Sequence, residues 1–343
     1  MNWLTAKPDW QECIRSGKSL VPKLPLFQAE AERAVQIMNM LRLPDVPGQP
    51  LMRDALGEWF RDCVRALFGS YDDATKQRYI RELFLLVPKK SSKTTGGAAL
   101  MITAMLMSRR PRAEYLLVAP TQEVADLAFR QAVGMIEADD VLRAKCHIQE
   151  HIKKITYRPT GVFLKVKSFD PKIVTGTKPA GVLIDELHVI AESHDADRVI
   201  GQLRGGLISQ PEGFLVTITT QSERPPAGVF RAELQKARDV RDGKLIAQIL
   251  PVLYEFPPET DWRDSKNWLM VTPNQGRSIT VDRLIPDYEQ AVAGGEGELR
   301  RWASQHLNLE IGLNLRSDRW AGADFWEEAE TVLTLDDLLS RCE

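Results

Sequence analysis

Residues 87–94 read VPKKSSKT, and the last two, Lys93 and Thr94, lead into an apolar stretch with the spacing of a helix. A loop that follows a strand and opens a helix directs backbone N–H groups at one point, where an anion can bind. A lysine there can neutralise phosphate oxygens, and a threonine hydroxyl can ligate Mg²⁺. The usual pattern, G-x-x-x-x-G-K-[ST], has glycine where this chain has Val87 and Ser92. The loop alone therefore leaves a nucleotide site and an ordinary basic turn both open.

Asp185 and Glu186 end a very apolar stretch, GVLIDE. Adjacent carboxylates at the end of a buried strand are typical of a Walker B motif, in which the Asp holds Mg²⁺ and the Glu polarises the attacking water. Solvated acids at a strand end are the plain alternative. That alternative is less favoured when a Lys-Thr loop lies upstream in the same predicted sheet.

A third polar strand end is Thr219, Thr220 and Gln221, which follow the apolar residues of LVTITTQS. Open α/β sheets bind their ligands at the carboxyl ends of the strands. These side chains could sense a γ-phosphate and relay its loss, although a threonine-rich strand end is also common. Thr121, which follows another strand, is expected to cap the next helix.

The elements that position these residues are predicted by hydrophobic periodicity. From residue 80 to 255, short apolar runs alternate with helical patterns, which predicts an α/β fold with a mostly parallel sheet and helices on both faces. Residues 153–169 read as a hairpin. Residues 52–70 have the pattern of one helix. The predicted organisation is a helical N-terminal region (1–75), an α/β core (76–255) and a second helical region (256–343).

Composition sets wider limits. The chain has 343 residues, 43% hydrophobic and 27% charged, which is normal for a globular protein. No apolar run approaches the roughly 18 residues of a membrane span, and the N-terminus lacks the apolar core of a signal peptide. We therefore expect a cytosolic protein without a membrane partner. The net charge of −2 predicts that any contact with nucleic acid is local rather than spread over the surface.

The cysteines are scattered, without a C-x-x-C pair. Cys146, His147 and His151 lie close together, but zinc sites usually need four well-spaced ligands. A polar helix end that runs into a strand is the favoured interpretation of this segment.

Taken together, the order and spacing of these segments resemble the ATPase domain of the large terminase subunit of tailed phages, of the HK97-like type. ALGEWFRDCVRALFG is similar to that family's adenine-side helix, VPKKSSKT to its Walker A loop, VLIDELH to its Walker B motif and TITTQS to its coupling motif. The resemblance covers roughly residues 45–320. It implies a RecA-like P-loop NTPase fold of the ASCE class.

The resemblance also implies roles for particular residues. Glu186, Lys93 and Lys89 would be catalytic, and Thr94 and Asp185 would hold Mg²⁺. Thr219, Thr220 and Gln221 would couple hydrolysis to movement, and Lys178 could act on a neighbouring subunit's nucleotide. ATP would contact a set of loop and adenine-side residues: Pro88, Lys90, Ser91, Ser92, Lys93, Thr94, Thr95, Trp59 and Phe60. Phe60 stands where the family carries an adenine-reading glutamine, so ring stacking would replace hydrogen bonding.

What the family does gives the functional expectation. The chain would be the ATP-hydrolysing motor domain that packages double-stranded DNA into procapsids, as part of a homo-oligomeric ring and as a monomer in isolation. Its partners would be duplex DNA, the portal protein and the small terminase subunit. It would act in the host cytoplasm and transiently at the portal vertex of the procapsid. The family's C-terminal nuclease would need about 150 further residues, so we expect it to lie outside this chain.

Two other functions remain open. DELH fits the D-E-x-H box of a helicase, although such helicases need a second RecA-like domain. The missing glycines would also fit a degenerate P-loop domain that binds a partner without turning over ATP.

Overall fold

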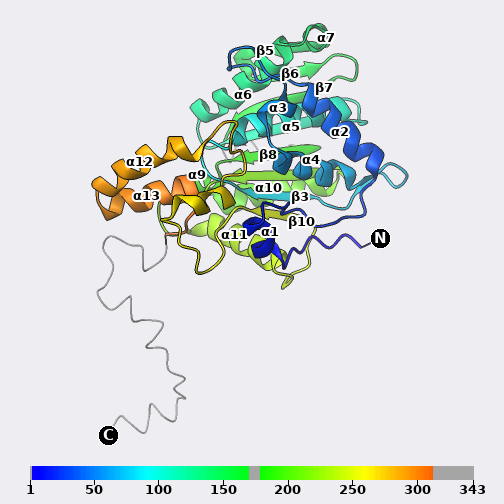
Figure 1. Ribbon diagram of the computed structural model, residues 1–343. Coiled ribbons are helices and arrows are strands. Elements are labelled where there is room, and N and C mark those ends of the chain that lie inside the picture. The colour runs from blue at the N-terminus through cyan, green and yellow to red at the C-terminus, as the bar shows by residue number, and fades with distance from the viewer. Residues whose placement is uncertain (1, 170–177, 312–343) are drawn as a thin grey trace, which may run out of the picture.

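An eight-stranded sheet forms the centre of the protein (Figure 1). The computed structural model describes residues 2–169 and 178–311. The strands lie side by side in the order β10-β3-β9-β8-β4-β7-β6-β5. Their bounds are β3 Glu82–Leu86, β4 Glu114–Ala119, β5 Cys146–Gln149, β6 Lys154–Tyr157, β7 Val162–Ser168, β8 Gly181–Asp185, β9 Phe214–Thr219 and β10 Ile249–Leu253.

The sheet is parallel from β10 to β7 and antiparallel at one edge, where β7, β6 and β5 pair. This arrangement confirms the predicted mostly parallel α/β fold and the hairpin within residues 153–169. Cys146 and His147 lie in β5, directly after the short helix α7 (Asp140–Lys145). The segment around Cys146 is therefore a helix end that runs into a strand, as the sequence predicted.

Helices cover both faces of the parallel part of the sheet (Figure 1). One core joins the sheet to α5 and α6 and to the N-terminal helices, and a second core on the opposite face joins it to α9, α10 and α11. Thr121 caps α6, because its hydroxyl accepts a hydrogen bond from the Val124 N–H. The bounds are α5 Lys93–Met107, α6 Gln122–Glu137, α9 Leu187–Ile190, α10 Ala196–Ile208 and α11 Gly228–Arg241.

The helix predicted over residues 52–70 is wrong in one respect, because the chain breaks it at Gly57. The backbone there is extended (ψ 167°), which ends α3 and begins α4. A Cβ on Gly57 would lie 2.5 Å from Cδ1 of Trp59, so a larger residue at this break would displace the Trp59 ring. The N-terminal elements are α1 Trp10–Arg15, α2 Gln28–Met40, α3 Met52–Ala55, α4 Glu58–Gly69, β1 Tyr71–Asp72 and β2 Gln77–Arg78.

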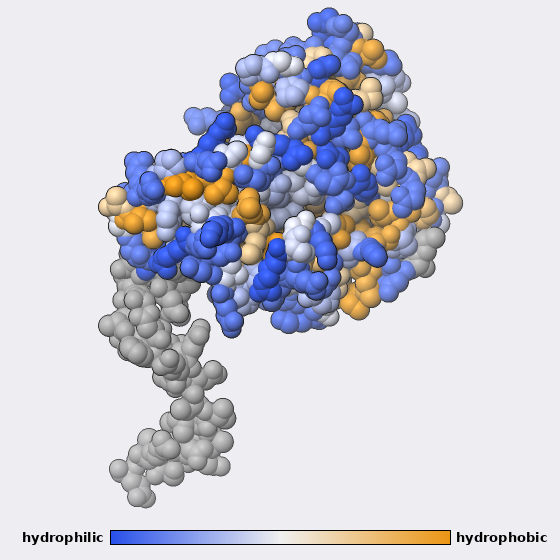
Figure 2. Space-filling model, in the orientation of Figure 1, coloured by the Kyte–Doolittle hydropathy of each residue, from blue (hydrophilic) through white to orange (hydrophobic). Residues whose placement is uncertain are grey.

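After β10 the chain forms a 3₁₀ helix, η2 (Ser265–Met270), and two helices, α12 (Val281–Ala293) and α13 (Glu296–Leu307). The two helices project to one side of the sheet (Figure 1), and Figure 2 shows hydrophobic residues over α12 on an otherwise mostly hydrophilic face. Of the predicted second helical region, residues 312–343 lie outside the described part. Within the described part, no helix has the length and apolarity needed to cross a bilayer.

Candidate functional site

The loop between β3 and α5 contains two non-glycine residues in the left-handed region, Lys90 (φ 68°) and Ser92 (φ 58°, ψ 31°). Ser92 holds the second glycine place of the phosphate-loop pattern, and its backbone adopts the conformation for which glycine is favoured. Val87, at the first glycine place, still donates its N–H to the Thr219 carbonyl and so extends the strand pairing. The glycine-poor loop therefore retains a tight turn into α5.

The first turn of α5 is built to receive an anion. It contains no acidic residue, and Ser92 makes no side-chain capping bond, so its N–H groups are not capped by a side chain. Lys93 is buried to 7% exposure at the same helix end. The hydroxyl of Ser91 is also buried, and no described residue bonds it. Backbone donors, a cation and a hydroxyl thus converge, as phosphate binding requires.

Asp185, at the end of β8, has the properties of a cation ligand. It is fully buried, and its Oδ2 accepts a hydrogen bond of 2.7 Å from the hydroxyl of Thr94. Its Oδ1 is buried without a hydrogen-bond partner among the described residues. Burial, and then the neighbouring charge of Glu186, raise the pKa of Asp185 to about 6. An unpaired buried carboxylate oxygen beside a hydroxyl fits the oxygen ligation that Mg²⁺ prefers.

Glu186 is held by the phosphate loop and by the neighbouring strand. Its Oε1 lies 2.8 Å from Nζ of Lys93, and its Oε2 accepts a 3.3 Å hydrogen bond from the Thr220 hydroxyl. Burial opposes the charged form, but the charges of Lys93 and then His188 hold the pKa of Glu186 below its usual value. The backbone of Glu186 is left-handed (φ 57°, ψ 53°), a strained conformation that is common at functional sites.

The predicted coupling residues, Thr219, Thr220 and Gln221, are fully buried beside Glu186. They also reveal a residue that the sequence analysis left without a role. His188 Nδ1 lies 3.1 Å from the Thr219 hydroxyl oxygen and 3.4 Å from Glu186 Oε2. Its place in DELH, two residues after Glu186, was the signal that could have identified it.

The segment after η2 contacts both α4 and the loop between β3 and α5. Oδ1 of the fully buried Asn274 accepts hydrogen bonds from the Gly57 N–H (3.0 Å) and from Trp59 Nε1 (3.3 Å). Its Nδ2 donates to the Ser278 hydroxyl oxygen, and that hydroxyl donates to the Lys90 carbonyl at 2.5 Å. The Asn274–Ser278 clasp thus connects α4 to the strained part of the loop.

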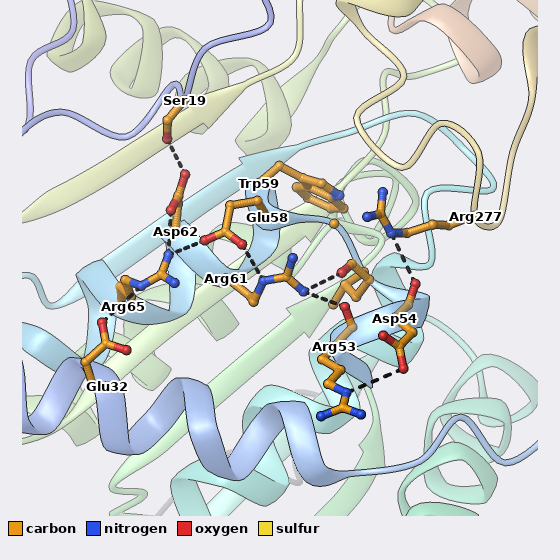
Figure 3. A network of polar contacts seen from close by, with 12 residues as sticks. Ser19, Glu32, Arg53, Asp54, Glu58, Trp59, Arg61, Asp62, Arg65 and Arg277 are labelled. Carbon is orange, nitrogen blue, oxygen red and sulfur yellow. Dashed lines mark hydrogen bonds and ion pairs between the residues drawn. The ribbon is translucent and has the colours of Figure 1, made fainter. Parts of the chain in front are cut away.

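Figure 3 shows the outer side of this contact, where Nε of Arg277 donates to the Asp54 carbonyl. On the same side, Arg61 binds Glu58 and donates to the backbone carbonyls of Arg53 in α3 and of Leu56 just after it. Arg65 extends the network to Glu58 and Asp62 along the helix. Polar contacts on both sides of the break at Gly57 therefore fix where α4 begins.

The structure does not support the expected stacking of Phe60 on a base. Phe60 is fully buried, and its ring atoms lie 3.0–3.1 Å from the place that a Cβ on Gly96 would occupy. Its ring therefore packs α4 against α5 and offers no face to a ligand. Trp59 is 8% exposed and makes edge-to-face contacts with Phe60 and Tyr254.

The end of α13 contacts two parts of the site at once. The Lys89 N–H donates to the Gln305 carbonyl, and the Gln221 N–H donates to Oδ1 of Asn308. Asn308 also donates from Nδ2 to the Tyr254 carbonyl. The end of α13 is thereby connected to the loop before α5 and to the residues that follow β9 and β10.

Three other predicted residues lie at varied distances from this centre. Pro88 is buried in the loop, whereas the Thr95 hydroxyl donates to Oε1 of Gln131 of α6 at 3.3 Å. Lys178 is exposed before the first residue of β8, and Asp185 is the last residue of that strand. Lys178 therefore does not join the site within one chain, and action on a neighbouring subunit stays a prediction.

Sequence comparisons agree with this geometry. A model of the terminase large subunit ATPase domain matches residues 58–234. Comparison with curated proteins gave no match. The crystal structure of the HK97 bacteriophage large terminase superposes with a TM-score of 0.67 at 19% identity, over 82% of this chain and 55% of that chain, so this chain spans about half of its length.

Two other solved structures superpose less well, with TM-scores below 0.5. The large terminase ATPase domain of Thermus phage P74-26 matches with a TM-score of 0.33 at 16% identity, over 43% of this chain and 62% of that chain. The UvsW helicase of bacteriophage T4 matches with a TM-score of 0.36 at 13% identity, over 61% of this chain and 67% of that chain. The family match spans more than half of the residues and includes Lys93, Asp185 and Thr219. It agrees in fold with the HK97 superposition. The chain belongs to the family of terminase large subunit ATPase domains.

Proposed function

We propose that this chain hydrolyses ATP and uses the free energy to move double-stranded DNA into a viral procapsid. The observation that supports hydrolysis best is the assembly of Lys93, Thr94, Asp185 and Glu186 at one edge of the sheet, within direct contact of one another. The family supports the coupling to DNA packaging. Duplex DNA, the portal protein, the small terminase subunit and further copies in a ring are the proposed partners, with the host cytoplasm and the portal vertex as the place of action.

In the proposed reaction the N–H groups at the start of α5 and the ammonium of Lys93 bind the β- and γ-phosphates. Thr94 and Asp185 would hold Mg²⁺, which when bound neutralises charge on the transferred phosphate. The carboxylate of Glu186, which its lowered pKa keeps ionised, orients the attacking water and accepts its proton. Lys89, on the same loop, is the proposed cation for the charge that develops in the transition state.

In this scheme the Lys93 ammonium can bind either Glu186 or phosphate. Its ammonium forms an ion pair with Glu186, and the same ammonium is the phosphate ligand. Phosphate binding would draw Lys93 away from Glu186, which would then be free to contact water. Release of phosphate would restore the ion pair, and the Thr220 hydroxyl would carry the change from Glu186 to the coupling strand.

The two alternative functions have less support. A partner-binding module without turnover would not need Asp185 Oδ1 left without a bond or Glu186 in a strained backbone. A helicase would need a second RecA-like sheet, and the described residues after Ser222 add only β10, which pairs with β3 in the same sheet. Nuclease activity, as a second function beside ATP hydrolysis, is proposed only for a longer protein that includes a nuclease domain.

The test is ATP turnover by the purified chain and its Glu186→Gln variant. We expect turnover to fall by about 10²–10⁴-fold while nucleotide binding persists, and Lys93→Ala to weaken binding itself. Glu192→Gln is the matched control, because Glu192 is exposed six residues away. Unchanged turnover in Glu186→Gln would refute the site assignment. Strand separation of a tailed duplex, without movement along a blunt duplex, would favour the helicase.

A further inference from the structure

The antiparallel edge of the sheet concentrates positive charge in a chain whose net charge is −2. Between residues 143 and 168 the only acidic residue is Glu150. Seven basic residues lie in the same segment: Arg143, Lys145, Lys153, Lys154, Arg158, Lys165 and Lys167. The segment forms α7, β5, β6 and β7, at the upper edge of the molecule in Figure 1.

Strand alternation sorts these residues between two faces. Ile155 of β6 and Leu164 and Val166 of β7 are buried against the core that α5 and α6 complete. The intervening side chains, Lys154, Lys165 and Lys167, point to the opposite face. We call this opposite face of β5, β6 and β7 the outer face.

None of the described helices packs buried side chains against the outer face. The core beneath α10 and α11 takes side chains from β3, β4, β8, β9 and β10, and none of its buried residues comes from β5, β6 or β7. The three strands also contain no Asp or Glu. The outer face is therefore a basic, half-buried sheet surface with hydroxyl and imidazole groups from Thr156 and His147 in the adjoining register.

Two lysines on the outer face lie opposite each other. Lys154 and Lys165 are direct partners in the antiparallel register of β6 and β7. Like charges directly opposite one another on a sheet are destabilising. Lys154 Nζ lies over the Phe163 ring at 4.2 Å, which offsets part of this cost without removing the repulsion. A polyanion on the outer face would reverse the sign of the interaction.

We propose that the outer face of β5, β6 and β7 contacts the phosphate backbone of duplex DNA. The proposal rests on the proposed function, since it assumes that the chain handles DNA. Lysines bind phosphates as point charges, and contacts to phosphate carry no sequence information. Such contacts suit a protein that moves along DNA of any sequence. β7 is separated from β8, which ends at Asp185, by β4 alone, so the outer face and the ATP site share one rigid sheet.

Duplex binding by the chain should be measured as a function of salt for wild type and for Lys154→Gln/Lys165→Gln. Each lost phosphate contact lowers the slope of log Kobs against log[salt] by about 0.9. We therefore expect the slope to fall by about 2 in the double variant. Lys154→Arg/Lys165→Arg should retain the wild-type slope. Lys23→Gln/Arg231→Gln removes two exposed charges outside this edge and should also behave as wild type.

A second measurement separates lost contacts from lost folding. Because Lys154→Gln removes a like-charge contact, the thermal midpoint of the double variant should stay within about 2 °C of wild type or rise, and basal ATP turnover should be unchanged. A wild-type salt slope in the double variant would overturn the outer face as the contact surface while leaving the proposed function intact. Absence of duplex binding by wild-type protein that hydrolyses ATP would overturn both this proposal and the DNA part of the proposed function.

Discussion

Replacement of Ser92 by glycine should stabilise the folded chain, although the same change elsewhere usually destabilises. Ser92 has φ 58° and ψ 31° and makes no side-chain capping bond. The left-handed conformation costs an L-residue about 1–2 kcal/mol, and the extra freedom of glycine in the unfolded chain costs about 0.5–1 kcal/mol. The difference predicts that Ser92→Gly raises the free energy of unfolding by about 0.5–1 kcal/mol.

Urea denaturation of wild type and variants measures this directly, provided that the m-value does not change. Ser92→Ala keeps a Cβ in the left-handed region and should therefore gain nothing. Ser209→Gly is the matched control, because Ser209 has φ −75° at the end of α10. Since that backbone is accessible to any residue, the control should lose about 0.5–1 kcal/mol.

The opposite signs of the two serine variants are the essential result. Equal losses in Ser92→Gly and Ser209→Gly would show that the turn into α5 carries no strain at Ser92. Gains of equal size in Ser92→Gly and Ser92→Ala would assign the effect to the hydroxyl rather than to the backbone. Either result would refute the argument that this position requires the conformation of glycine.

Three further predictions concern the elements around the loop. Asn274→Ala should lower the free energy of unfolding by about 2–3 kcal/mol, because the buried donors of Gly57 and Trp59 lose their acceptor. The same variant should raise KM for ATP more than it lowers kcat. An unchanged KM would contradict a role for the Asn274–Ser278 clasp in nucleotide binding. The pKa of His306 is lowered to about 4, chiefly by burial. As the pH falls, the unfolded chain therefore takes up a proton before the folded chain does, and the free energy of unfolding should fall by about 1 kcal/mol between pH 7.5 and 5.5. Denaturation curves of His306→Gln should lack that part of the pH dependence. Gly97→Ala should cost about 1–3 kcal/mol, because its Cβ would lie 2.8 Å from Leu183 Cδ1, whereas Gly201→Ala, with nothing within 4 Å, should stabilise α10 in the same thermal assay.

The sequence predicted the parallel sheet because its signals are local. Each strand from β3 to β10 is a short apolar run, and the alternation of strands and helices restricts the connections to a parallel arrangement. The polar ends of β8 and β9 meet because neighbouring parallel strands end at the same edge. Thr94, Asp185 and Glu186 could therefore be grouped before any contact was known.

Contacts between distant segments could not be predicted in the same way. Asn274 lies in TPNQG, which reads as an ordinary turn, and nothing local indicates that its side chain reaches Gly57. Base stacking was predicted for Phe60 because this residue stands where the resembled family carries an adenine-reading glutamine. Its burial is decided instead by Gly96, which lets α4 approach α5. Helix-to-helix distances of this kind depend on the whole packing rather than on a motif.

The absent glycines do not indicate a degenerate site. Three residues at this site adopt left-handed backbones, Lys90, Ser92 and Glu186. Glycine would adopt this conformation at a lower energetic cost at each position. Sequences depart from local preference mainly where function requires strain, provided that other contacts over-determine the geometry. Here those contacts are identifiable: Ser278 binds the Lys90 carbonyl, and Lys93 pairs with Glu186. Because Ser278 belongs to the segment between η2 and α12, the shape of the loop depends on residues far along the chain, and a protein truncated before that segment should lose the turn that a glycine would otherwise maintain.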